Sequence, residues 1–341
     1  MPRTDPSDRR WRNFRIFNEQ GGKFRIGIIN TCNLSCFFCH NEAMPNPRVA
    51  QSAPLQQHGP EPLPVERLLR IMNTYAAMGG RQINITGGEP LVYPQLAHLS
   101  AQIEKHDTRV VLNTNAVLGQ RLLSMEKLST IDGLLASLHT TQESTFHKQL
   151  GGSGIGKVME NLVALRDHGY DVVLNFSLGL YNRDDFDGVL KFSRRNRLPL
   201  KVIALVRSHE EPSSLQGDWV DPGWIDEKLD SFGAELMSSD TALGGYKSTY
   251  NIDGVIVELK NVARGSLRTN YCDGCEMNAS CGEGIYGLRV GVDGLWKPCL
   301  LRTDGYRKVE DNRSDEDQIL EIIDTMIGNW SEAQFSQGVP E

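Results

Sequence analysis

The chain has 341 residues, of which 39% are hydrophobic, so it is long enough to bury one large core with a smaller unit attached. Its formal net charge of −7 provides no basic surface for a polyanion, which excludes nucleic acid as the expected substrate. No apolar run approaches the roughly 20 residues that span a bilayer, and the N-terminus lacks the apolar segment of a secretory signal. We therefore expect a cytoplasmic protein without membrane contact.

The first 20 residues are charged and are predicted to form a flexible N-terminal segment. Short β-rich runs then alternate with amphipathic stretches. The predicted strands are 24–29, 82–86, 109–113, 133–138, 172–178 and 201–206, and the predicted helices include 64–78, 96–105, 156–168 and 184–194. Six such repeats predict an α/β fold with a partial (β/α)6 TIM-like barrel over residues 21–207, whose site lies at the carboxyl ends of the strands.

Three cysteines follow the first predicted strand with the spacing Cys-x3-Cys-x2-Cys, and they are Cys32, Cys36 and Cys39. They supply three thiolates where a cube of four irons needs four, so one iron is left for a small-molecule ligand. Two other interpretations stay open. Residues 36–40 also match the Cys-x-x-Cys-His motif of haem attachment, which requires export, and a zinc site can use three thiolates with a histidine.

A second motif, Gly87-Gly88-Glu89-Pro90, follows the strand predicted at 82–86. Its glycines allow a ligand to approach the backbone, and its carboxylate can hold an ammonium group. Together with the cysteine loop, it resembles the radical S-adenosylmethionine (SAM) superfamily. The resemblance implies a 4Fe–4S cluster whose open iron chelates SAM, a flavodoxin- or ferredoxin-type reductant, and a 5′-deoxyadenosyl radical that removes hydrogen from a substrate.

The same resemblance assigns roles to individual residues. Cys32, Cys36 and Cys39 ligate the cluster, while Phe38 lies against adenine. Ser137 and Asn175 help to hold SAM, and Thr114 and Asn115 border the substrate or the ribose. The residues expected to receive the methionine end are Gly87, Gly88, Glu89 and Pro90.

Four more cysteines, spaced Cys-x2-Cys-x5-Cys-x17-Cys, gather near the C-terminus, and they are Cys272, Cys275, Cys281 and Cys299. A hairpin predicted from strands 288–292 and 295–299 can return the last cysteine to the others. We predict a second, auxiliary 4Fe–4S cluster, with zinc and a disulfide pair as alternatives. We assign residues 208–223 to a linker and 224–341 to a C-terminal auxiliary-cluster domain.

This second set resembles the twitch or SPASM-type domain in the branch that contains the GTP cyclase of molybdenum-cofactor biosynthesis. The chain departs from the cyclase pattern because Asn84 and Val173 replace basic residues and Glu276 follows Cys275 where an Asn-Arg-x-Arg run is usual. Each lost charge-assisted contact to a triphosphate would cost about 1.5–3 kcal/mol. We therefore expect a small polar sugar, nucleoside or aminocyclitol as substrate, in a biosynthetic, antibiotic-type pathway, and decarboxylation, dehydrogenation or C–C coupling as the reaction.

Two residues are candidates for substrate or proton chemistry. Arg25, on the first strand, can pair with a carboxylate or phosphate, or can be a surface ion-pair partner. His139 can shuttle a proton near neutral pH, or can be a structural hydrogen-bonding residue. The alternative functions are a peptide maturase, a divergent GTP cyclase and an iron–sulfur electron carrier.

Overall fold

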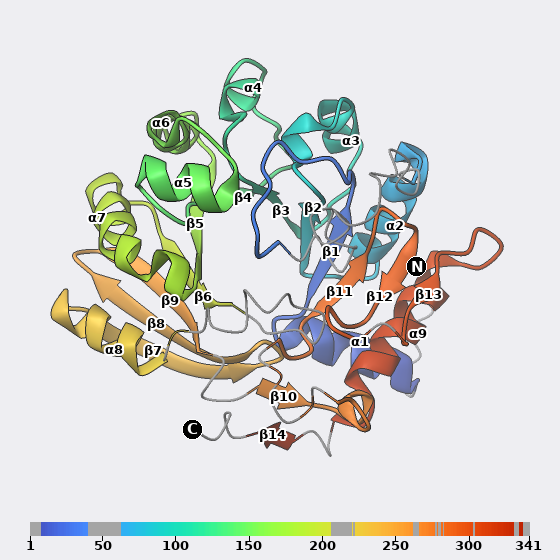
Figure 1. The fold of residues 1–341 in the computed structure, drawn as a ribbon. Helices are drawn as coiled ribbons and strands as arrows, with labels where there is room; N and C mark the ends of the chain where they lie inside the picture. The colour runs from blue at the N-terminus through green and yellow to red at the C-terminus, as the bar shows by residue number, and fades with distance from the viewer. Residues whose placement is uncertain are drawn as a thin grey trace, which may run out of the picture.

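Most of the chain folds around a twelve-stranded sheet that curls into an open half-barrel, as the computed structural model shows (Figure 1). The structure describes residues 8–39, 63–205, 220, 222–261, 266–276, 278, 281, 283–302, 304–330 and 334–336. The strand order is β13-β12-β11-β1-β2-β3-β4-β5-β6-β9-β8-β7. The predicted α/β half-barrel is therefore confirmed.

Six parallel strands form the centre of this sheet in chain order. They are β1 (Lys23–Gly27), β2 (Gln82–Thr86), β3 (Arg109–Thr114), β4 (Gly133–Ser137), β5 (Asp171–Leu178) and β6 (Leu200–Ala204). All six strand predictions are confirmed, with small shifts at the ends.

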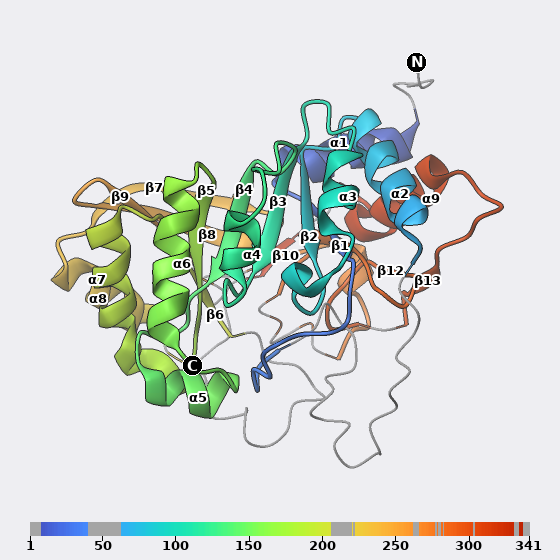
Figure 2. The same cartoon turned by 90° about the horizontal axis from the view of Figure 1, so that it is seen from above.

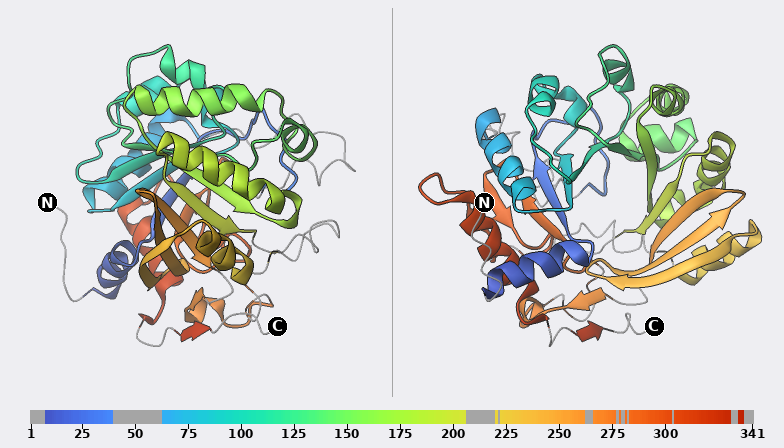
Figure 3. Two further views of the ribbon diagram at one scale, coloured as in Figure 1. Left: turned by 90° about the vertical axis from the view of Figure 1, so that its left-hand side faces the viewer. Right: turned by 180° about the vertical axis from the view of Figure 1, so that it is seen from behind.

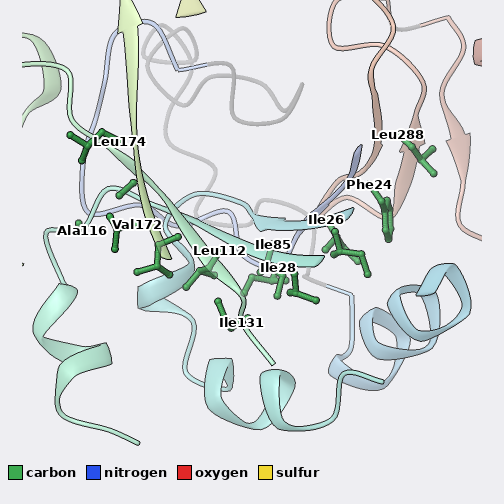
Figure 4. Packing of buried hydrophobic residues seen from close by; sticks show 14 of the residues in the cluster. Phe24, Ile26, Ile28, Ile85, Leu112, Ala116, Ile131, Val172, Leu174 and Leu288 are labelled. Atoms are coloured by element: carbon green, nitrogen blue, oxygen red, sulfur yellow. The ribbon is translucent and has the colours of Figure 1, made fainter. Parts of the chain in front are cut away.

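Helices cover the convex face of the half-barrel (Figure 2). They are α2 (Val65–Ala77), α3 (Leu96–Ala101), α4 (Gly119–Leu123), α5 (Glu143–Leu150), α6 (Ile155–Asp167) and α7 (Phe186–Asn196), with short 3-10 turns η3 (Pro90–Val92) and η4 (Leu180–Asp185). Apolar residues on alternate strand positions, such as Phe24, Ile26 and Ile85, pack in the core between strands and helices (Figure 4). Because side chains alternate along a strand, Arg25, Asn84 and their counterparts face the concave side.

The C-terminal part of the chain adds strands to both edges of the same sheet. On the β1 side lie β11 (Gly287–Val290), β12 (Leu295–Lys297) and β13 (Arg307–Lys308), and on the β6 side lie β9 (Val255–Asn261), β8 (Gly245–Ile252) and β7 (Glu235–Ala242). Further elements of this part are α8 (Pro222–Ser231), η6 (Asn270–Cys272) and the pair β10 (Ser266–Arg268) and β14 (Gln334–Ser336). The hairpin predicted before Cys299 is present as β11 and β12, which are antiparallel.

The domain boundaries remain predictions, because strands from the predicted C-terminal domain belong to the barrel sheet itself. Most of the predicted linker, 208–223, lies outside the described residues.

The N-terminal segment differs from its prediction, because residues 9–19 form a helix, α1 (Arg9–Glu19), rather than a flexible stretch. Its charged composition hides a stripe of apolar residues, and Trp11, Phe14 and Phe17 are buried. The helix lies beside α9 (Asp315–Ile327) (Figure 3), and Asn13 Nδ2 donates a hydrogen bond to Asp324 Oδ1 at 2.8 Å. Among the described helices, α1 included, none is both long and apolar enough to cross a bilayer.

Candidate active site

The loop that carries the first three cysteines leaves β1 and is held against the end of α5. The predicted ligands on it are Cys32, Cys36 and Cys39. The backbone N–H of Ser35 donates to the carbonyl of Leu150 at 2.9 Å, and that of Phe37 donates to Gln149 at 3.3 Å. These bonds fix the path of the loop at the carboxyl end of the sheet, where the site was predicted.

The glycine turn after β2 packs directly on the start of this loop. The N–H of Gly88 donates to the carbonyl of Ile29 at 2.6 Å, and that of Glu89 donates to Thr31 at 2.9 Å. A Cβ on Gly87 would lie 2.3 Å from the Ile29 oxygen, and one on Gly88 would lie 2.1 Å from the Thr31 oxygen. Glycine is required here because any side chain would push the turn away from the cysteine loop.

Glu89 joins this turn to the end of β3. Its side chain is 1% exposed, and its Oε1 accepts hydrogen bonds from the Leu91 N–H at 3.0 Å and the Thr114 hydroxyl at 2.7 Å. Its Oε2 accepts from the Asn115 N–H at 2.7 Å. Burial raises the pKa of Glu89, although these hydrogen bonds oppose the rise. The neighbouring Pro90 begins η3 and is buried.

Asn115 continues this network to the first cysteine. Its Nδ2 donates to Asn33 Oδ1 at 2.8 Å and lies 3.8 Å from Cys32 Sγ, which also accepts from the Leu34 N–H at 3.4 Å. Burial raises the pKa of Cys32, and the bond from Leu34 opposes that rise. The glycine turn, the end of β3 and the cysteine loop therefore form one connected unit.

Phe38 and His139 contact each other within an aromatic cluster beside this unit. Their ring centroids are 5.1 Å apart at 90°, and the ring of Tyr181 lies 5.2 Å from Phe38. His139 Nδ1 accepts the Ser177 N–H at 3.0 Å, and burial lowers the pKa of His139 to about 4. The imidazole is thus neutral at physiological pH, which favours the structural role over the predicted proton shuttle. Tyr181 was missed by the sequence reasoning because no motif marks it.

Ser137 and Asn175, both predicted to hold SAM, are register partners on β4 and β5. Asn175 Oδ1 is buried and has no hydrogen-bond partner among the described groups. A buried acceptor of this kind is normally satisfied by a ligand or water. This acceptor fits a bound small molecule with a donor group. The Glu89 carboxylate, which was predicted to hold an ammonium group, is instead buried and already accepts three hydrogen bonds from the protein.

Residues 26–193 match the radical SAM superfamily. The chain contains a radical SAM domain. It is accordingly an enzyme of the radical SAM class, which implies SAM and a 4Fe–4S cluster as cofactors.

Relatives of this radical SAM enzyme extend the match beyond the domain. It is 26% identical over 290 residues to a probable GTP 3',8-cyclase of Methanococcus maripaludis, covering 84% of this chain and 88% of that protein. Its fold resembles Streptococcus suis SuiB bound to S-adenosylmethionine, with a TM-score of 0.54, 13% identity, and coverage of 81% of this chain but only 60% of SuiB. It also resembles anSMEcpe with bound AdoMet, with a TM-score of 0.55, 14% identity, and coverage of 89% and 80%.

The second cysteine group lies C-terminal to the radical SAM domain. Cys272 ends η6, the Cys275 N–H donates to the Cys272 carbonyl at 3.2 Å, and Cys299 follows β12. The pKa of Cys272 is raised to about 11, mainly by burial, and the nearby Cys281 and Cys299 contribute to the rise. These three thiols therefore share one neighbourhood.

Neither cysteine group is drawn together as a metal site, because the described residues contain no cluster of three His, Cys, Asp or Glu side chains arranged to hold an ion. Thiolates commonly reach their final positions only when the metal binds. Both ligand sets remain predictions.

Proposed function

We propose that this radical SAM enzyme removes hydrogen from a small polar metabolite of the sugar, nucleoside or aminocyclitol class in a biosynthetic pathway. The reaction would be a decarboxylation, a dehydrogenation or a C–C coupling. The observation that carries the proposal is a row of amide side chains on the concave face beside the SAM site.

The amide row runs across β2 and β3. Gln82 Nε2 donates to Asn84 Oδ1 at 2.8 Å, and Asn84 Nδ2 donates to Asn113 Oδ1 at 2.9 Å. Asn84 occupies the position where the cyclase pattern has an arginine, and its amide is already engaged by neutral partners. The buried, neutral Asn84 therefore cannot supply the charge-assisted contact to a triphosphate that an arginine would supply. The partly exposed amides of Gln82 and Asn113 suit hydroxyl and carbonyl groups.

We propose that Cys32, Cys36 and Cys39 hold the cluster and that the glycine turn, Ser137 and Asn175 hold SAM. When bound, this pair supplies the reagent that takes a hydrogen atom from carbon. Glu89 and Asn115 keep the glycine turn and the cysteine loop in place. Phe38, Tyr181 and the neutral His139 cover one side of the site with weakly polar rings and limit the entry of water.

We further propose that the second cysteine group binds an auxiliary 4Fe–4S cluster through Cys272, Cys275, Cys281 and Cys299. Four thiolates leave no open iron, so this cluster would serve electron transfer or folding rather than substrate binding. A flavodoxin- or ferredoxin-type protein would supply the electron.

Cyclisation of GTP is the second candidate, because the similarity to a probable GTP 3',8-cyclase covers most of both chains. The neutral amide row opposes it. A peptide maturase is less favoured still, because the likeness to SuiB supports the fold alone.

The first test measures iron, sulfide and electron paramagnetic resonance on the anaerobically reconstituted protein, with and without SAM. The comparison is with the variant Cys32→Ala/Cys36→Ala/Cys39→Ala. We expect about eight irons in the wild type and about four in the variant, with SAM perturbing only the wild-type signal. About four irons in the wild type and none in the variant would contradict the auxiliary cluster. SAM cleavage that GTP stimulates would favour the cyclase.

A further inference from the structure

A group of lysines around one carboxylate lies on the concave side, outside the SAM site. This lysine group consists of Lys23, Lys201 and Lys247 around Glu258. Lys201 Nζ lies 3.0 Å from Glu258 Oε1, and Lys247 Nζ lies 3.6 Å from Glu258 Oε2. Lys23 comes from β1, which is separated from β6 in the sheet by four strands. The half-barrel therefore brings these side chains together across its concave side.

The lysine group carries more positive than negative charge. The pKa of Lys23 is lowered to about 7. The largest cause is repulsion from Lys201, and burial is the next. Arg25 and Lys247 act in the same direction, and Glu258 acts against them. Burial would raise the pKa of Glu258, yet the surrounding lysines hold it at about 2. One carboxylate thus remains ionised but does not balance its cationic neighbours.

In a purely structural ion-pair network each buried cation normally has a matching anion, because uncompensated buried charge is costly. Within the described part of the chain, Glu258 pairs with Lys201 and Lys247, and Lys23 forms no ion pair. Here repulsion from Lys201 is the main effect on Lys23. An excess of positive charge of this kind is typical of sites where a bound anion neutralises it.

The lysine group also lies next to the SAM site. Asn175, predicted to contact SAM, is the register partner of Ser137 on one side and of Lys201 on the other, and Lys201 in turn faces Glu258. A molecule bound at the lysine group would therefore lie beside Asn175, whose buried Oδ1 has no hydrogen-bond partner among the described groups. Its anionic group would meet the lysines, and a hydroxyl group would donate to Asn175.

We propose that the lysine group binds the anionic group, a carboxylate or a phosphate monoester, of a hydroxylated substrate. This inference rests on the proposed function and narrows its substrate class to sugar acids or sugar phosphates and their nucleoside-linked forms. It also gives the substrate a direction, with its anionic group at the lysine group and its hydroxylated body toward Asn175 on β5.

The test is isothermal titration calorimetry on the reconstituted enzyme with SAM, using glucose 6-phosphate, glucuronate and glucose as probes. We compare the wild type with Lys23→Met and Lys247→Met. The control is Lys157→Met on the outer helix α6, where Lys157 is 58% exposed and pairs with Glu160 at 3.1 Å. At least one anionic probe should bind the wild type about tenfold more tightly than glucose. Lys23→Met and Lys247→Met should lose that preference, and Lys157→Met should keep it.

The two anionic probes separate the sources of the charge. Preference for glucose 6-phosphate alone supports a phosphate monoester, and preference for glucuronate alone supports a sugar acid. If neither binds better than glucose, or if Lys157→Met loses as much as Lys247→Met, the inference is overturned. Retained SAM cleavage in the same samples would then leave the proposed function standing.

A second measurement uses only the wild type, in case the variants fold poorly. Acetic anhydride at pH 7.5 should acetylate Lys23, as followed by peptide mass spectrometry, because a lysine that loses its proton near pH 7 is a good nucleophile. The probe that binds in calorimetry should slow acetylation of Lys23 severalfold. Unchanged acetylation at saturating probe would contradict binding at the lysine group.

Discussion

The two cysteine groups differ in how the chain builds them. Cys32, Cys36 and Cys39 share a single loop, which is held by backbone bonds to the end of α5. The second group is divided between η6 and the residues after β12, so it forms only when the hairpin has joined the sheet. When all the cysteines of a group lie on one loop, their spacing in the sequence is enough to predict the site. When they lie on separate elements, the site depends on the tertiary fold.

The sheet order also separates the two groups in space. β11 runs parallel to β1 and β12 returns antiparallel, so Cys299 lies toward the end where β1 begins, while Cys32 follows the end where β1 finishes. The concave face, with its amide row and its lysine group, extends between these two ends. Five predictions test this contrast.

Removing one predicted ligand from each cysteine group should affect SAM cleavage very differently. Cys36→Ala should reduce SAM cleavage by at least about a thousandfold, because the open iron that binds SAM needs all three thiolates of its loop. Cys299→Ala should keep SAM binding to the first cluster. The measurement is 5′-deoxyadenosine formed with dithionite as reductant, together with electron paramagnetic resonance. Full SAM cleavage by Cys36→Ala would sink the central assignment.

The largest effect on stability should come from removing Trp296, which anchors the β11–β12 hairpin in the core. Trp296 is 1% exposed, its ring lies 6.1 Å from that of Phe24, and its Nε1 donates to Gln318 at 3.2 Å. Trp296→Ala should lower the free energy of unfolding by about 3–5 kcal/mol in urea denaturation. Leu236→Ala, at a side chain that is 58% exposed on β7, should change it by less than about 0.5 kcal/mol. Equal losses would mean that the hairpin does not anchor the sheet.

Glu89→Gln should weaken the connection between the two SAM-site motifs. The amide cannot accept from Thr114, Leu91 and Asn115 together, so we expect a loss of about 1–3 kcal/mol in stability and weaker SAM binding. Glu143→Gln is the matched control, because the Glu143 carboxylate also accepts two backbone N–H groups but lies near the surface. Similar SAM affinity in both variants would argue against the connecting role of Glu89.

The lysine group should have a smaller effect on the free energy of unfolding, and this effect should depend on pH. The pKa of Lys23 falls from 10.5 to about 7 on folding, so the unfolded chain holds a proton that the folded chain releases between these values. The free energy of unfolding should therefore rise with pH in this window, by at most about 1.4 kcal/mol per pH unit. Urea denaturation at pH 7 and pH 9 should show a shallower rise for Lys23→Met, which should also exceed the wild type in stability at pH 7. If the free energy of unfolding of Lys23→Met rose with pH as steeply as that of the wild type, a lowered pKa of Lys23 would be contradicted.

His139 should have the smallest effect on catalysis. Since burial lowers the pKa of His139 to about 4, it does not titrate between pH 6 and 8, and His139→Gln should keep the wild-type pH profile of SAM cleavage there. The unfolded chain takes up this proton near pH 6.5, so the wild type should lose stability more steeply than His139→Gln as pH falls from about 6.5 to 4. A profile shifted by His139→Gln would restore the proton-shuttle hypothesis.

The sequence was most informative where structure and chemistry are local. Alternating β-rich and amphipathic runs located all six central strands, and the Gly87-Gly88 pair predicted a close backbone approach. The partner of that approach was not predictable, because the Ile29 and Thr31 carbonyls come from a distant part of the chain.

Other features depend on which side chains are buried, and the spacing of residues in the sequence does not show this. The charged residues of 9–19 concealed an apolar stripe that only its contact with α9 explains. His139 was assigned a possible proton-transfer role because its low pKa follows from its enclosure rather than from its neighbours in sequence. The lysine group was invisible because Lys23 and Lys201 meet only across the curved sheet.

The position of β1 between β2 and β11 has a consequence for synthesis of the chain on the ribosome. β1 is among the first strands made, but its partner β11 is made near the end. Until then one edge of β1 can hydrogen-bond only to water or to another chain, and exposed strand edges favour aggregation. The nascent protein should therefore depend on chaperones late in translation, and truncations that remove β11 should accumulate in inclusion bodies.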